Sequence, residues 1–87
     1  MLKHIPELIG LLGEVEREVR RATSLHGKFS GPHESYAVLL EEVDEFWDEV
    51  KAYPKRHNPA NMRKELIQIA AMAIRAVIDL DLKPEAT

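Results

Sequence analysis

The chain has 87 residues, of which 45% are hydrophobic, with a formal net charge of -3 and no cysteine. This length predicts one domain, residues 1–87, near the lower limit for independent folding. The absence of cysteine excludes disulfides, thiolate zinc sites and a cysteine nucleophile. The acidic balance gives no basic footprint and argues against a dedicated nucleic-acid-binding protein.

Targeting and membrane segments are not predicted. Residues 1–7 lack the long apolar run and the cleavage site of a signal peptide. The most apolar stretch, residues 66–82, is interrupted by four polar or charged side chains, Gln68, Arg75, Asp79 and Asp81. We therefore expect a soluble cytoplasmic protein with no membrane partner.

A first helix is predicted over residues 6–22, because apolar residues recur there at helical spacing. Charged residues fall on the opposite side of this helix. Residues 23–31 lose the periodicity and are rich in Gly and Ser, which predicts a loop. The apolar positions are Leu8, Leu12, Val15, Val19 and Ala22.

Two longer helices follow, over residues 32–53 and 59–82. The second helix begins with a proline, which suits the first helical position, and Pro54 stops it. The third helix begins with Asn58 as its cap and Pro59 as its first residue. No segment has the alternating pattern of a strand.

The predicted fold class is therefore all-α with three principal helices. A short connector makes the second and third helices antiparallel neighbours. Their apolar faces are too broad for a lone helical hairpin to cover, so we expect oligomerisation into a four-helix or larger bundle.

Residues 41–49 hold six carboxylates in nine positions. At 100° per residue, Glu42, Glu45 and Glu49 border the apolar arc of the second helix. Like charges within one turn repel each other, so the cluster needs water, cations or a metal. A solvated acidic face is the alternative interpretation. The remaining acids, Glu41, Asp44 and Asp48, point further outward.

A metal site is predicted because a second pair faces the first. Glu42 and Glu45 are separated by three positions, and Glu65 and Gln68 repeat this spacing on the third helix. Oxygen ligands without His or Cys favour a hard cation, Mg²⁺ or Mn²⁺. Magnesium is commonly completed by substrate phosphates, which points to phosphoryl chemistry.

Two further acids of the same stretch have predicted roles. Glu49 lies one turn beyond Glu45 and is a candidate additional ligand. Glu41 is the candidate base for the attacking water.

The segments 41–46 and 64–68 together resemble the MazG-type all-α nucleoside triphosphate pyrophosphohydrolases. Their motif is Glu-x-x-Glu followed, after a helix-turn interval, by Glu-x-x-Asp. The resemblance implies a helical bundle assembled as a dimer or tetramer. It also implies Mg²⁺-dependent cleavage of a nucleoside triphosphate to a monophosphate and pyrophosphate. By this resemblance Glu42, Glu45 and Glu65 are metal ligands. Gln68, which stands where Asp is usual, is a further predicted ligand through its carbonyl oxygen.

A triphosphate substrate requires cationic partners. Arg75 falls on the same face as Glu65, which favours either phosphate binding or an internal pair with Asp79 or Glu65. The other predicted substrate contacts are Lys28 and Lys64 for the phosphates and Phe29 and His33 for the base.

The leading prediction is a Mg²⁺-dependent nucleotide pyrophosphohydrolase. A second hypothesis is a catalytically silent helical oligomer that binds nucleotide or a protein partner, which Gln68 favours because it carries no charge. A third is an interaction module that uses the Phe46 and Trp47 face as a groove for a partner.

Overall fold

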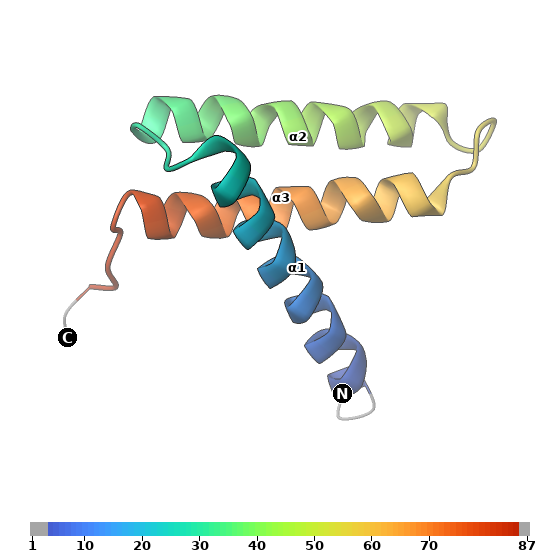
Figure 1. Cartoon of the computed structure of the whole chain (residues 1–87). Coiled ribbons are helices and arrows are strands. Elements are labelled where there is room, and N and C mark those ends of the chain that lie inside the picture. The colour runs from blue at the N-terminus through green and yellow to red at the C-terminus, as the bar shows by residue number, and fades with distance from the viewer. Residues whose placement is uncertain (1–3, 86–87) are drawn as a thin grey trace.

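The computed structural model describes residues 4–85, which form three helices and no strand. They are α1 (Ile5–His26), α2 (Pro32–Ala52) and α3 (Pro59–Asp79). Helices α2 and α3 lie side by side and run antiparallel, and α1 crosses α3 at a steep angle (Figure 1). The predicted all-α class with three principal helices is confirmed.

The starts of α2 and α3 agree with the sequence signals. Both helices begin at a proline, Pro32 and Pro59. The Oδ1 atom of Asn58 accepts a hydrogen bond from the backbone N–H of Asn61 at 3.0 Å. This bond satisfies one of the helix-terminal N–H groups that have no partner within the helix, as expected for an N-cap asparagine.

The ends of α1 and α3 differ from the prediction. Helix α1 continues to His26, so the polar residues that follow Ala22 extend the helix and do not form a loop. It ends at Gly27, whose φ of 74° and N–H bond to the Thr23 carbonyl terminate the helical path. Helix α3 ends at Asp79, three residues before its predicted end.

The core is small and lies where α3 contacts both other helices. Ala71 has no exposed surface and packs with Val15 and Ala22 of α1. Its small side chain permits the close approach of two helices. The buried apolar residues are Val15, Ala22, Phe29, Ala71 and Met72.

The N-terminal half of α1 projects away from the α2/α3 pair (Figure 1). Leu8 and Leu12, which the periodicity places on the apolar face, are 54% and 56% exposed. The radius of gyration is 14.8 Å, against about 12 Å for a compact domain of this length. A single chain therefore leaves much of its apolar surface uncovered.

None of the helices in residues 4–85 combines the length and apolar composition required to cross a membrane.

Candidate metal centre and adjoining clefts

Three carboxylates from two helices converge at the contact between α2 and α3. Glu42 and Glu45 lie one turn apart on α2, and Glu65 lies opposite them on α3. Each offers an oxygen, and these oxygens all lie within 4.8 Å of one another. We call these three residues the acidic cluster. The antiparallel packing thus brings the predicted Glu42/Glu45 pair to face Glu65.

The acidic cluster is electrostatically crowded. Burial and the charges of Glu45 and Glu65 raise the pKa of Glu42 to about 7. Burial, followed by the interaction with Glu45, also raises the pKa of Glu65. The Oε2 atom of Glu65 is buried and has no hydrogen-bond partner. An acceptor in this state is costly, so the site suits a bound cation.

A cleft of about 410 Å³ opens between α1 and α2, with α3 as its floor. We call it the central cleft. Its apolar lining consists of Ala22, Phe29, Val38 and Met72, and Glu42 connects it to the acidic cluster. The charged and polar residues that also line it are Glu18, Arg21, His26, Lys28, Glu34, Glu41, Gln68 and Arg75.

Arg75 lies beneath the central cleft and is 2% exposed. Its guanidinium donates to the Gly27 carbonyl at 2.6 Å and stacks 4.4 Å from the centre of the Phe29 ring. Its nearest carboxylate is Asp79, at 4.0 Å. Asp79 in turn accepts a bond from the Phe29 backbone N–H at 3.0 Å. The internal pair anticipated for Arg75 is therefore present, and it fastens the α1–α2 loop to α3.

The other predicted substrate contacts are distributed unevenly. Phe29 is buried and, with exposed Lys28, lines the central cleft. Lys64 is exposed and faces a different hollow, on the α1 side of α3. His33 is exposed and is not among the residues that line the central cleft.

Glu41 and Glu49 flank the acidic cluster without belonging to it. Glu41 is exposed at the rim of the central cleft, next to Glu42. Glu49 is half-buried one turn further along α2 and is not one of the three grouped carboxylates.

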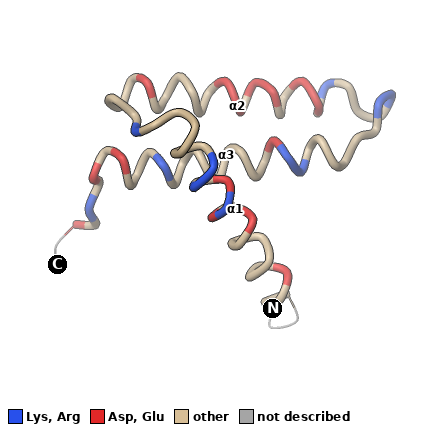
Figure 2. The backbone as a smooth tube through the Cα atoms, viewed as in Figure 1, with Lys and Arg blue, Asp and Glu red and all other residues tan. Residues whose placement is uncertain are grey.

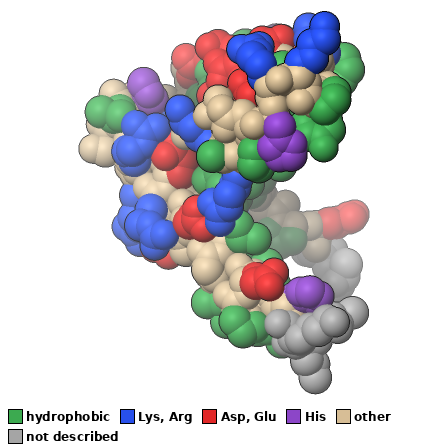
Figure 3. All heavy atoms as spheres, turned by 90° about the vertical axis from the view of Figure 1, so that its right-hand side faces the viewer, with side chains coloured by type: hydrophobic (Ala, Val, Ile, Leu, Met, Phe, Trp, Pro, Cys, Tyr) green, Lys and Arg blue, Asp and Glu red, His purple; other side chains and the backbone are tan. Residues whose placement is uncertain are grey.

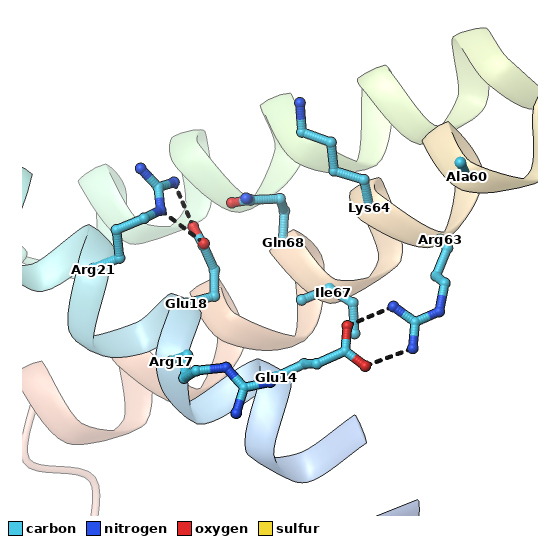
Figure 4. Close-up of a pocket in the computed structure, with 9 residues that line it drawn as sticks. All are labelled: Glu14, Arg17, Glu18, Arg21, Ala60, Arg63, Lys64, Ile67 and Gln68. Carbon is cyan, nitrogen blue, oxygen red and sulfur yellow. Dashed lines mark hydrogen bonds and ion pairs between the residues drawn. The ribbon is translucent and has the colours of Figure 1, made fainter. Parts of the chain in front are cut away.

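Gln68 lies one turn after Glu65 but is oriented toward α1. Its amide lies beside Glu18 (Figure 4). Hydrogen bonds from Arg21 and, to a smaller extent, from Gln68 lower the pKa of Glu18. Gln68 lines both the central cleft and the hollow next to it, so it stands at their border.

The second hollow, of about 760 Å³, lies between α1 and the first half of α3. We call it the basic hollow. Its lining comprises Glu14, Arg17, Glu18, Arg21, Ala60, Arg63, Lys64, Ile67 and Gln68 (Figure 4).

The cations of α1 in the basic hollow were not predicted as site residues. The backbone view shows basic and acidic positions mixed along α1, whereas acids dominate α2 (Figure 2). Basic and acidic side chains also adjoin each other at the surface (Figure 3). In sequence this mixture indicates only a solvated helix face, because the crossing of α1 over α3 is a tertiary feature.

No protein-family model, curated protein or solved structure matches the chain. Its function is therefore inferred from the acidic cluster and the two spaces beside it.

Proposed function

We propose that this protein is a Mg²⁺-dependent nucleoside triphosphate pyrophosphohydrolase of the MazG-like kind. The observation that carries the proposal is the convergence of Glu42, Glu45 and Glu65 within 4.8 Å at the contact between two helices. A merely solvated acidic face would not require the partly buried Glu65 on a different helix.

The donor set fits a hard divalent cation. All three groups offer carboxylate oxygens, which magnesium and manganese prefer over nitrogen or sulfur ligands. The unpartnered Glu65 Oε2 and the pKa of about 7 at Glu42 are both signs of charge without compensation. When bound, Mg²⁺ would supply positive charge to phosphate oxygens and acidify a water.

The protein groups around the acidic cluster have separate tasks in this proposal. Glu42, Glu45 and Glu65 hold the cation. Glu41, at the rim of the central cleft, accepts the proton of the attacking water. Hydrolysis adds this water across the α–β anhydride bond and yields a nucleoside monophosphate and pyrophosphate.

The central cleft supports a nucleotide-sized ligand. Its volume of about 410 Å³ falls within the range of about 300–1,000 Å³ that is usual for small-molecule sites. Phe29, Val38 and Met72 provide an apolar lining for a base, and Glu42 connects that lining to the acidic cluster.

Oligomerisation is part of the proposal. The chain exposes 6849 Å², whereas a folded monomer of 9.9 kDa is expected to expose about 5,200 Å². Stable homodimers commonly bury about 2,000 Å² or more in total. Exposed Val43 and Trp47 on α2, with Leu66 and Val77 on α3, supply such a surface. We propose a homodimer or homotetramer built on these apolar faces.

A cytoplasmic location also belongs to the proposal, because nucleoside triphosphates and Mg²⁺ are available there.

The test is an assay of pyrophosphate release from a panel of nucleoside triphosphates, with and without Mg²⁺. We expect Mg²⁺-dependent release by the wild-type chain and at least a hundredfold loss, on the order of 3 kcal/mol in the barrier, for Glu45→Gln. Asp44→Asn is the matched control, because Asp44 is the exposed acid directly before Glu45 and lies outside the cluster. Release that is equal in wild type and Glu45→Gln, or absent from both, would contradict the proposal.

The neutral Gln68, which stands where the MazG-like motif has Asp, favours a second candidate function. In this alternative the chain is an oligomer that binds nucleotide and Mg²⁺ without hydrolysis. Calorimetric titration with Mg²⁺ and a non-hydrolysable triphosphate distinguishes the two, since it detects binding in the absence of turnover.

A further inference from the structure

The basic hollow carries a surplus of positive charge. Four basic side chains and two carboxylates line it. Two of the cations are paired, Arg21 with Glu18 at 2.7 Å and Arg63 with Glu14 at 2.5 Å.

The surplus resides on Arg17 and Lys64. Neither forms an ion pair among the residues that the structure describes. Both are exposed and free to reorient toward a ligand. The side chains of the paired arginines, Arg21 and Arg63, are more than half exposed, and a guanidinium that bonds a carboxylate can also bond a phosphate.

The position of the hollow relates it to the proposed catalytic site. It shares Glu18, Arg21 and Gln68 with the central cleft, so the two spaces adjoin at these three residues. Lys64 directly precedes Glu65 of the acidic cluster. Figure 4 shows the Arg21–Glu18 and Arg63–Glu14 pairs at opposite ends, with Gln68 and Lys64 between them.

We propose that the basic hollow binds the β- and γ-phosphates of the substrate and retains the pyrophosphate product. This inference rests on the proposed function and assigns the two ends of the triphosphate. The nucleoside end occupies the central cleft, and the polyphosphate end crosses the border at Gln68 into the hollow.

This assignment explains why a neutral amide, and not a carboxylate, occupies position 68. Its amide N–H groups are neutral donors at the crossing point and can bond to a phosphate oxygen. A carboxylate at this position would repel the passing phosphates, since it would add negative charge beside Glu18.

The test measures binding of inorganic pyrophosphate to the full chain by calorimetry. The double variant Arg17→Gln/Lys64→Gln removes two exposed cations that form no ion pair within residues 4–85, so we expect the fold to be retained. We expect pyrophosphate to bind the wild type and the dissociation constant to rise about tenfold or more in the double variant.

The matched control is Arg20→Gln. Arg20 lies on α1, is exposed and pairs with Glu16 at 2.9 Å. It lines a separate hollow that also includes Ile74 and is not among the residues that line the basic hollow. We expect its pyrophosphate affinity to stay within twofold of wild type. Equal weakening by Arg20→Gln, an unchanged double variant, or no pyrophosphate binding by the wild type would overturn the inference.

A second measurement requires no substitution. Addition of pyrophosphate should shift the backbone NMR signals of residues 17–21 and 63–68 and leave those of residues 44–52 unchanged. Shifts confined to other segments would overturn the assignment. Pyrophosphate binding in the hollow by a chain that hydrolyses no nucleotide would support this inference and contradict the proposed function. Nucleotide hydrolysis by the wild type, with an unchanged pyrophosphate affinity in the double variant, would support the proposed function and contradict this inference.

Discussion

Glu42 and Glu65 offer carboxylate oxygens within 4.8 Å of each other across two antiparallel helices. Neither forms an ion pair within residues 4–85. Burial of Glu42, followed by the nearby charges of Glu45 and Glu65, raises its pKa to about 7. The close approach of the Glu42 and Glu65 carboxylates destabilises the chain at neutral pH when no metal is bound. A divalent cation held between them would offset this repulsion.

The first prediction concerns pH and stability. The pKa of Glu42 is 4.5 as its ordinary value and about 7 in the folded chain, so the folded state binds more protons between these values. The contribution of Glu42 to stability is therefore fully present below about pH 4.5 and is lost as pH rises through about 7. We expect the melting temperature without metal to fall between about pH 5 and pH 8.

The control for this prediction is a saturating concentration of Mg²⁺. It should remove the decrease, because a bound cation stabilises the ionised carboxylates. A melting temperature that is independent of pH with and without Mg²⁺ would contradict the electrostatic account of the acidic cluster.

The second prediction is that Glu42→Gln separates stability from metal binding. At pH 8 without Mg²⁺ the variant should melt at a higher temperature than wild type, because one repelling charge is removed. Its Mg²⁺ affinity should fall about tenfold or more, since a charged oxygen ligand is lost. Calorimetry of Mg²⁺ binding measures this, with Asp44→Asn as control. If Glu42→Gln bound Mg²⁺ with wild-type affinity, Glu42 would be excluded as a metal ligand.

The third prediction concerns the attachment of the α1–α2 loop. Arg75→Ala should destabilise the fold by about 2–4 kcal/mol, because it leaves Asp79 and the Gly27 carbonyl with fewer partners and opens a cavity. Arg20→Ala, which removes an exposed cation, should stay within about 0.5 kcal/mol. Chemical denaturation measures both. A loss for Arg75→Ala as small as the control would mean that the loop is held elsewhere.

The fourth prediction concerns the apolar face of α3. Leu66 is exposed in the single chain, so Leu66→Glu should preserve helicity while it dissociates the proposed homo-oligomer. Light scattering coupled to gel filtration gives the mass. Lys55→Gln changes the charge by the same amount in the exposed connector and should leave the mass unchanged. An unchanged mass for Leu66→Glu would remove this face from the interface.

The parts of the fold that could be predicted are those set by local sequence. The starts of α2 and α3 follow from Pro32, Pro59 and the Asn58 cap, because each of these residues constrains the backbone next to it. The predicted end of α1 at Ala22 was wrong, because the polar residues that follow suggested a loop. The helix continues to His26 and ends at Gly27, which has a positive φ.

The candidate site also has a part that could be predicted from the sequence and a part that could not. The meeting of Glu42 and Glu45 with Glu65 follows from helical spacing and a short antiparallel connection. The basic hollow depends on the angle at which α1 crosses α3, and no local pattern determines that angle. For this reason Arg17 and Arg21 were placed on a solvated face although they line a hollow beside the cluster.

The most direct test of the account is whether the acidic cluster holds one divalent ion at a defined place. Mn²⁺ added at less than one equivalent should broaden the NMR signals around Glu42, Glu45 and Glu65 first, and Mg²⁺ should restore them. Equal broadening at exposed acids remote from the cluster, such as Glu7 and Glu16 on α1, would indicate only unspecific binding to solvated carboxylates. That result would contradict the metal centre and the hydrolase built on it.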